Sequence, residues 1–247
     1  ILIVFIYFKF RKVRLINPAF TRKTIRWGTA DILRAVIILL FFGACLSAVK
    51  LNPMAATMIY DIFAVGVVLM FVAVKYKHKL KYAGLSSKNP FKNIITGILA
   101  YLAILPVLFA VLLAVMAVVE LTGFKPPLQP AIKLFMLETR TPALFCFTIF
   151  VSVLGPFAEE LFFRGFAYPA VKKRLGVKSA LFIVAFLFAA LHADRVAFFP
   201  ILTLGLLLGW LYEKTGSLIP SFTVHFIHNS VTISFVFLIK RLMSVLT

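Results

Sequence analysis

Long apolar runs alternate with short polar and basic stretches along most of the chain. Runs of about 18 or more apolar residues are long enough to cross a bilayer as single helices. The pattern predicts an all-α fold, a polytopic transmembrane helical bundle of about 7–8 membrane helices. The helical stretches are expected at about 30–50, 54–74, 93–119, 131–173, 178–193, 196–212 and 217–240. One bundle accounts for the length, so we expect residues 1–247 to form a single integral-membrane domain.

Proline and glycine mark irregular points in this pattern. Pro106 predicts a kink in the third span. The stretch 120–130 holds Gly123 and three prolines, which favours an ordered connection that is not helical. The next helical pattern, from about 131 to 173, is expected to be interrupted at Gly155 and Pro156.

Composition and charge place the chain in a membrane. It is 62% hydrophobic, which excludes an ordinary soluble domain. The net charge of +19 is concentrated in linkers at 9–26, 75–92 and 172–178, the arrangement that sets orientation in a membrane. We therefore place these linkers on the inner side and expect a multi-pass plasma-membrane protein whose partner is the lipid bilayer and not nucleic acid.

Two of the eight acidic residues, Glu159 and Glu160, are adjacent inside an apolar stretch. An ionisable residue in a transmembrane segment is costly and indicates function. Glu160 and Arg164 are four residues apart, which predicts an ion pair on one helix face. Glu159 points about 100° away and has no cation one turn along its own face, which leaves a lone carboxyl suited to acid–base chemistry.

Three further polar residues interrupt the last helices at a comparable depth. With a rise of about 1.5 Å per residue, Glu159 and His192 lie roughly 22 and 21 Å from the basic inner turn, and His225 and Asn229 lie roughly 12–18 Å from that side. His225 and Asn229 share a helix face. These four residues form the candidate catalytic site.

Other buried polar residues have simpler explanations. His228 is expected to pack, and His78 is expected to be solvated within its run of lysines. Asp61 is the intramembrane acid without an evident role. A polar packing contact is favoured for it, and pairing with Arg34, contact with water, or a role in substrate passage are the alternatives.

The motifs Glu159-Glu160-x-x-x-Arg164, Phe188-x-x-x-His192 and His225-x-x-x-Asn229 occur in that order. In this respect the chain resembles the CPBP family of intramembrane proteases, with a protease-like catalytic core at about 143–240. That family includes type II CAAX prenyl endopeptidases and Abi-like bacterial proteins linked to bacteriocin processing or self-immunity. The resemblance implies that Glu159 and His192 activate water, that His225 and Asn229 hold the oxyanion, and that Glu160 and Arg164 support the site.

The residues leave the mechanism and the function open. No cofactor is expected, but Glu159, His192 and His225 are also the ligand types of a catalytic zinc site. The leading hypothesis is an intramembrane endopeptidase whose substrate is a prenylated protein, or a leader or sorting-signal peptide. The alternatives are a non-catalytic membrane binding or immunity protein with the same fold and, third, a proton-coupled transporter.

Overall fold

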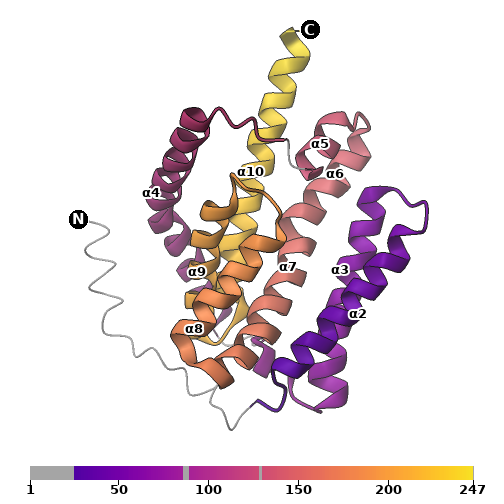
Figure 1. Cartoon of the computed structure of the whole chain (residues 1–247), viewed down its shortest axis with the longest axis vertical. Helices are drawn as coiled ribbons and strands as arrows, with labels where there is room; N and C mark the ends of the chain where they lie inside the picture. The colour runs from indigo at the N-terminus through magenta and orange to yellow at the C-terminus, as the bar shows by residue number, and fades with distance from the viewer. Residues whose placement is uncertain (1–24, 86–88, 128–129, 247) are drawn as a thin grey trace.

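A computed structural model describes residues 25–85, 89–127 and 130–246 (Figure 1). These residues form helices joined by turns and contain no strand. The longer helices are α2 (Thr29–Ser47), α3 (Pro53–Leu69), α4 (Pro90–Thr122), α8 (Tyr168–Leu191), α9 (Phe198–Thr215) and α10 (Leu218–Leu246). The shorter ones are α5 (Pro130–Leu137), α6 (Thr141–Ile149) and α7 (Gly155–Glu160), with η2 (Met70–Lys75), η3 (Leu80–Ala83), η4 (Phe150–Leu154) and η5 (Leu161–Ala167).

The prediction of a polytopic helical bundle is confirmed. Among the described residues, 5 helical stretches are long and apolar enough to cross a membrane. One of them, Thr141–Leu191, has 51 residues, far more than the roughly 20 that a single crossing needs. The backbone leaves helical geometry at Gly176, with φ 80° and ψ 176°, so this stretch makes two passes. With α9 counted, the described residues make seven passes.

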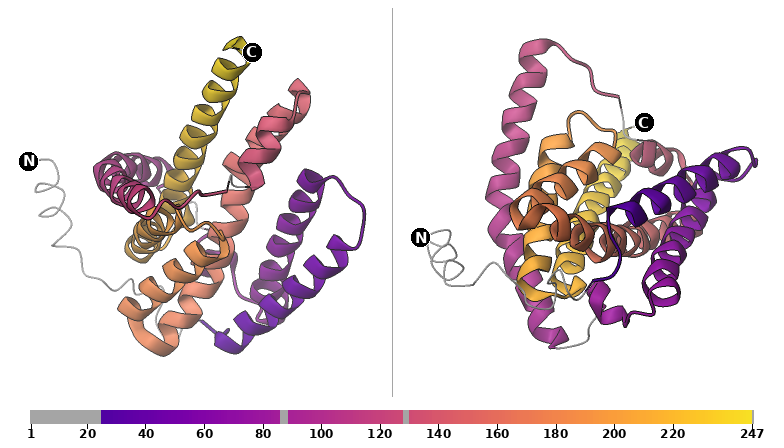
Figure 2. Two further views of the ribbon diagram at one scale, coloured as in Figure 1. Left: turned by 45° about the horizontal axis from the view of Figure 1, so that its top comes forward. Right: turned by 60° about the horizontal axis from the view of Figure 1, so that its bottom comes forward.

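The helix that carries the acidic pair lies at the centre of the bundle. It is built from η4, α7 and η5, and it packs against α10 on one side and against α3 on the other. Figures 1 and 2 show the same order, with the α2–α3 hairpin standing beside the helices α7 to α10. The buried aromatic residues Trp27, Phe166 and Tyr168 join the hairpin to η5 in one apolar core. Residues on α7 can therefore be reached from both α3 and α10.

The prediction that the helix is interrupted at Gly155 and Pro156 is wrong. The helix ends instead at Leu137, and the carboxylate of the following Glu138 accepts hydrogen bonds from the backbone N–H groups of Thr139 and Arg140. From Thr141 the chain then runs helically through Gly155 and Pro156, because η4 widens into π-helical geometry just before them. A π-helical turn absorbs the missing proline N–H without ending the helix.

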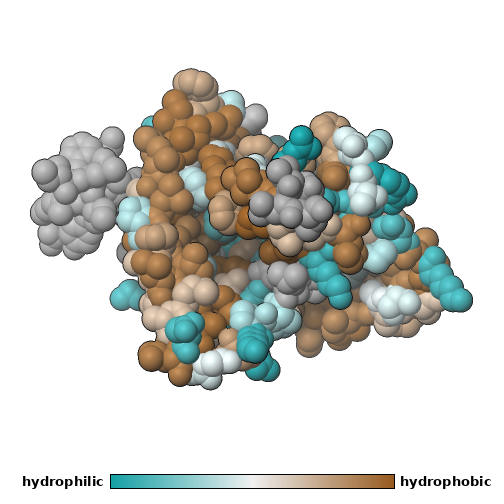
Figure 3. Space-filling model, turned by 90° about the horizontal axis from the view of Figure 1, so that it is seen from above, coloured by the Kyte–Doolittle hydropathy of each residue, from teal (hydrophilic) through white to brown (hydrophobic). Residues whose placement is uncertain are grey.

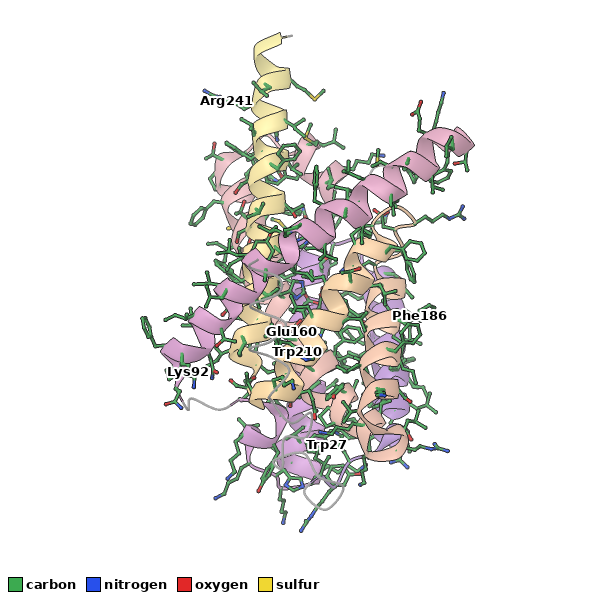
Figure 4. All side chains as sticks on the ribbon, turned by 90° about the vertical axis from the view of Figure 1, so that its left-hand side faces the viewer. Trp27, Lys92, Glu160, Phe186, Trp210 and Arg241 are labelled. Carbon is green, nitrogen blue, oxygen red and sulfur yellow. The ribbon has the colours of Figure 1, made fainter. Side chains whose placement is uncertain are left out.

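The polar ends of the bundle match the predicted sides. Figure 4 places Trp27 and Lys92 toward one end and Arg241 at the other. Asp31, near the Trp27 end, accepts hydrogen bonds from Arg34, Lys75 and the Tyr76 hydroxyl. The basic linker predicted at 9–26 lies mostly outside the described residues.

His78 is not solvated as predicted. Its ring packs edge-on against Trp27 and Tyr82, with centroid distances of 5.8 and 5.0 Å. Burial lowers the pKa of His78 below its usual value, and the neighbouring Arg26 adds to the effect. The lysines near His78 in the sequence therefore do not make its ring fully solvent-exposed.

The outer surface suits contact with lipid. Large apolar side chains of α4 are exposed, among them Leu99, Phe109, Leu113 and Val118. Figure 3 shows hydrophobic residues over much of the face seen from above. Exposed apolar area of this extent has a favourable environment in hydrocarbon and not in water.

Replacing Gly165 with Ala should destabilise the protein, because an added Cβ would lie 2.7 Å from the backbone oxygen of Ala83. Overpacking of this kind costs about 1–3 kcal/mol. Thermal melting in detergent measures the loss. Gly66→Ala is the matched control, since nothing lies within 4 Å of its added Cβ. Equal melting temperatures for the two variants would contradict the close approach of η3 and η5.

Candidate active site

The predicted ion pair between Glu160 and Arg164 is present and fully buried. Arg164 Nη1 lies 2.8 Å from Glu160 Oε1, and both side chains are 0% exposed. The other end of the guanidinium donates to the Gly205 carbonyl at 3.2 Å. Its plane lies 4.4 Å from the centre of the Phe188 ring. Arg164 thus ties the η5 segment to α8 and α9, and Figure 4 shows Glu160 well inside the bundle.

His225, on α10, is held by the same carboxylate. Its Nδ1 lies 3.1 Å from Glu160 Oε1. An ionised carboxylate only accepts hydrogen bonds, so Nδ1 is the donor and Nε2 is the ring nitrogen that faces the site. That nitrogen lies 3.7 Å from Glu159 Oε2. Glu160 therefore orients the imidazole toward Glu159, as a carboxylate commonly orients a functional histidine.

Glu159 is the carboxylate left open. Its side chain is 36% exposed, whereas that of Glu160 is 0% exposed. One of its oxygens, Oε2, is buried and has no hydrogen-bond partner among the described residues. Glu160 is thus paired with a guanidinium, whereas Glu159 has the His225 imidazole at 3.7 Å and no arginine or lysine partner within the described residues. A carboxylate with free acceptor capacity beside an oriented histidine can bind and deprotonate water.

Asn229 is positioned by the irregular helix across from it. In η4 the backbone N–H of Gly155 bonds to the Phe150 carbonyl, five residues back. The next bond in this register would run from residue 156 to the Val151 carbonyl, but Pro156 has no N–H. Asn229 Nδ2 donates to that carbonyl instead, at 2.9 Å. An amide nitrogen carries two N–H groups, so one fixes the side chain and the other is left for a ligand.

His192 is placed apart from the other three residues. It lies at the C-terminal end of α8, and its Nδ1 is 2.7 Å from the Phe188 carbonyl. Since a carbonyl only accepts, Nδ1 is the donor, and Nε2 is the ring nitrogen left for other contacts. No hydrogen bond or ion pair joins His192 to Glu159, His225 or Asn229 within the described ranges. The Phe188 ring lies between, with centroid distances of 4.7 Å to His192 and 5.7 Å to His225.

The arrangement brings Glu160 into contact with Arg164 and His225, and it places His225 beside Glu159. Asn229 lies one turn from His225 on α10 and is bonded to the Val151 carbonyl. His228 packs edge-on against Tyr101 of α4, as the packing interpretation predicts. In the part of the chain that the structure describes, no group of three or more His, Cys, Asp or Glu side chains is arranged to hold a metal ion. The zinc alternative and the expectation of no cofactor both stay predictions.

Sequence reasoning missed a second buried network below the site. Glu213 of α9 is 0% exposed, accepts a hydrogen bond from the Tyr168 hydroxyl at 2.9 Å, and lies 2.8 Å from Lys172 Nζ. This network joins the first turns of α8 to α9, four to eight residues after Arg164 in the sequence. A signal was available, since Glu213 is one of eight acids in the chain and follows an apolar stretch.

Comparison with known proteins finds a similarity to a family of membrane endopeptidases. Residues 141–231, which hold all of the candidate site, match the family model described as "Type II CAAX prenyl endopeptidase Rce1-like". Through this segment the chain is similar to that family, and the resemblance inferred from the three motifs is confirmed.

Comparison with curated proteins and with solved structures gives less information about function. "Uncharacterized protein YpbD" of Bacillus subtilis (strain 168) is 37% identical over 87 residues, which is 34% of this chain and 42% of the relative. The chain thus matches less than half the length of that curated protein. No solved structure matches.

Replacing Arg164 with Ala should cost stability before it affects chemistry. Removing one partner of a buried pair typically costs about 3–5 kcal/mol, because the other charge is left unpaired. We expect lower yield and a lower melting temperature in detergent. Arg140→Ala is the control, because its pair with Glu138 is largely exposed and should not matter measurably. An inactive Arg164→Ala protein that melts like the wild type would instead assign Arg164 to the reaction or to substrate binding.

Proposed function

We propose that the chain is an intramembrane endopeptidase that uses a glutamate-activated water to hydrolyse a peptide bond. The observation that carries the proposal is the open Glu159 carboxylate beside the anchored imidazole of His225, inside a membrane-spanning bundle. A carboxylate kept at this depth with a buried oxygen that accepts no hydrogen bond is costly, which favours a catalytic role over a structural one. The family match to an endopeptidase supports the same conclusion.

The proposed reaction uses each side chain for one task. Glu159 takes a proton from water, and the water oxygen forms a bond to the carbonyl carbon of the substrate. The carbonyl oxygen becomes negative and accepts hydrogen bonds from Asn229 Nδ2 and from protonated Nε2 of His225. The carbon–nitrogen bond then breaks, and Glu159 returns its proton to the leaving nitrogen.

His192 would act on the water from a greater distance. Its Nε2 is the free acceptor, because Nδ1 is bound to the Phe188 carbonyl. We propose that it accepts a hydrogen bond from the attacking water, or from a second water next to it. His192 lies at the C-terminal end of α8, where its ring is exposed, so it is accessible to a bound substrate.

The mechanism proposed here needs no metal. Glu159 supplies the base, and the separation of His192 from Glu159 and His225 gives no support to zinc bound by these three residues. Zinc at this site remains the alternative mechanism, in which the metal would polarise the substrate carbonyl and activate the water.

The substrate proposed is an apolar or lipidated peptide segment. A groove of about 840 Å³ lies between α4 and α9 and is lined by apolar residues such as Val115, Val119, Leu202 and Leu206. It reaches Arg195, which follows His192 by three residues in the sequence. A prenyl group, or the hydrophobic part of a leader or sorting-signal peptide, would fit such a lining. The bilayer of the plasma membrane would present these substrates laterally.

Two other functions are testable against this one. A membrane binding or immunity protein with the same fold would bind peptide without cleaving it. A proton-coupled transporter would use the same buried Glu and His as a relay, but it would be expected to carry repeated halves with matching broken helices, and the chain has a single Gly-Pro pair in its polar half.

Replacing Glu159 with Gln tests the proposed function. We expect loss of peptide-bond cleavage and a melting temperature that is not lowered, because the amide keeps the shape but cannot take a proton. The measurement is the appearance of new peptide termini, by mass spectrometry, after incubating proteoliposomes with a host membrane-protein extract. Glu120→Gln, at an exposed position of α4, should cleave like the wild type. Undiminished cleavage by Glu159→Gln would refute the mechanism, and a wild type that binds but never cleaves would favour the binding protein.

Replacing Asn229 separates the possible roles of the amide. If it donates to the oxyanion, Asn229→Ala should lower kcat by about 10²–10³ with KM nearly unchanged. Asn229→Asp should be at least as damaging, because a carboxylate repels the developing charge. A packing amide would instead lower the melting temperature and leave kcat normal in the folded fraction. A metal ligand would tolerate Asp, so an active Asn229→Asp protein would favour zinc.

A further inference from the structure

Asp61 is a charged group within a membrane span whose role the proposed reaction does not explain. It lies in α3, in the stretch Pro53–Lys75 that is apolar enough to cross the membrane. Arg34, the cation considered for it from the sequence, pairs with Asp31 instead. Within the described ranges the Asp61 carboxylate has no hydrogen bond and no ion pair. An intramembrane acid without a partner is a functional residue by default.

The carboxylate faces the helix that carries Glu159. Asp61 Oδ2 lies 3.7 Å from the position that a Cβ on Gly155 would take. Gly155 and Glu159 are four residues apart on α7, so they lie one above the other on the same helix face. Asp61 is also close enough to Glu159 for the two charges to interact. Two carboxylates, from α3 and α7, thus lie on one side of α7. Glu159 has the His225 imidazole at 3.7 Å, and Asp61 has no ion pair within the described ranges.

The space between them is on the opposite side of Glu159 from the oxyanion donors. His225 and Asn229 come from α10, Asp61 comes from α3, and the central helix packs between α10 and α3. Figures 1 and 2 show this order of helices. A peptide bond held at Glu159 with its oxygen toward α10 therefore has its nitrogen side toward α3.

We propose that Asp61 is a second carboxylate of the active site, which accepts a hydrogen bond from the scissile nitrogen and from the amine released there. This inference rests on the proposed function. Glu159 takes the proton from water and returns it to the nitrogen as the carbon–nitrogen bond breaks. Asp61 gains and loses no proton in this step. It holds the N–H group in position and stabilises the positive charge that the nitrogen acquires.

The same arrangement has a cost in stability. Two unpaired carboxylates at close range repel each other, and one of them is desolvated without compensation. Residues kept for activity often destabilise the fold in this way, so that removing them stabilises the protein. A polar packing residue would behave oppositely, because its loss would remove a favourable contact.

The test measures kcat, KM and melting temperature for Asp61→Asn and Asp61→Leu in proteoliposomes or detergent. We expect kcat to fall by about tenfold to a hundredfold, the effect of losing one hydrogen bond to a charged group, with KM little changed. We expect the melting temperature to rise or stay the same in both variants. Asp61→Glu should recover part of the activity. Tyr60→Phe is the matched control, because its ring stacks on Phe42, away from α7, and it should match the wild type.

Two outcomes would overturn the inference. One is a lower melting temperature for Asp61→Asn with a normal kcat in the folded protein, which would make Asp61 a packing residue. The other is a double-mutant cycle of Asp61→Asn with Glu159→Gln in which the melting temperatures are additive, which would show that the carboxylates do not interact.

The cycle also separates this inference from the proposed function. Repulsion between the two carboxylates exists whether or not the protein cleaves peptides, so non-additive melting temperatures would support the pair even for an inactive wild type. In that case the peptidase assignment and the hydrogen bond to a leaving amine would both be wrong. Cleavage by the wild type with an additive cycle would leave the peptidase intact and remove Asp61 from its site.

Discussion

The buried contact between Arg164 and Glu160 is the interaction on which the rest of the site depends. In hydrocarbon an isolated charge is too costly to keep, and an ion pair within one helix is the least demanding way to keep two. Once Arg164 is fixed by Glu160, its guanidinium also reaches the Gly205 carbonyl and the Phe188 ring. The remaining acceptor capacity of Glu160 then holds His225. One carboxylate therefore fixes contacts from α8, α9 and α10 to the central helix.

Departures from α-helical geometry supply the other fixed points. The π-helical segments η4 and η5 flank the acidic pair. In each, a backbone carbonyl is bonded by a side chain from far along the sequence: Asn229 binds that of Val151, and Trp27 Nε1 binds that of Phe166 at 2.9 Å. A wide helical turn with a free carbonyl would be costly in a membrane without such a donor. The irregular backbone and the long-range polar contacts thus require each other.

The sequence predicted the parts of this structure that depend on local spacing and on depth. The helical passes followed from the length of apolar runs, and the Glu160–Arg164 pair followed from a separation of four residues. An estimate of depth along the membrane does not, however, predict the direction in which a side chain leaves its helix. His192 packs against the Phe188 ring and has no hydrogen bond to Glu159, His225 or Asn229 within the described residues. The π-helical form of η4 could not be predicted from local sequence, because it depends on a contact with Asn229, which lies 78 residues after Val151.

The carboxylates of this bundle share one chemistry and differ only in their partners. Glu160 has a guanidinium and an imidazole, and Glu213 has an ammonium and a phenol, so both are fixed by charged or polar partners and are closed to solvent. Glu159 has one imidazole at 3.7 Å, and Asp61 has no cation within the described residues. Such differences in partners have large effects on the free energy of each carboxylate in a membrane interior, because no water screens the charges there. Acids that anchor helices therefore differ from acids that are free to react in their charged and polar partners. Those partners are set by the fold and not by the residue type.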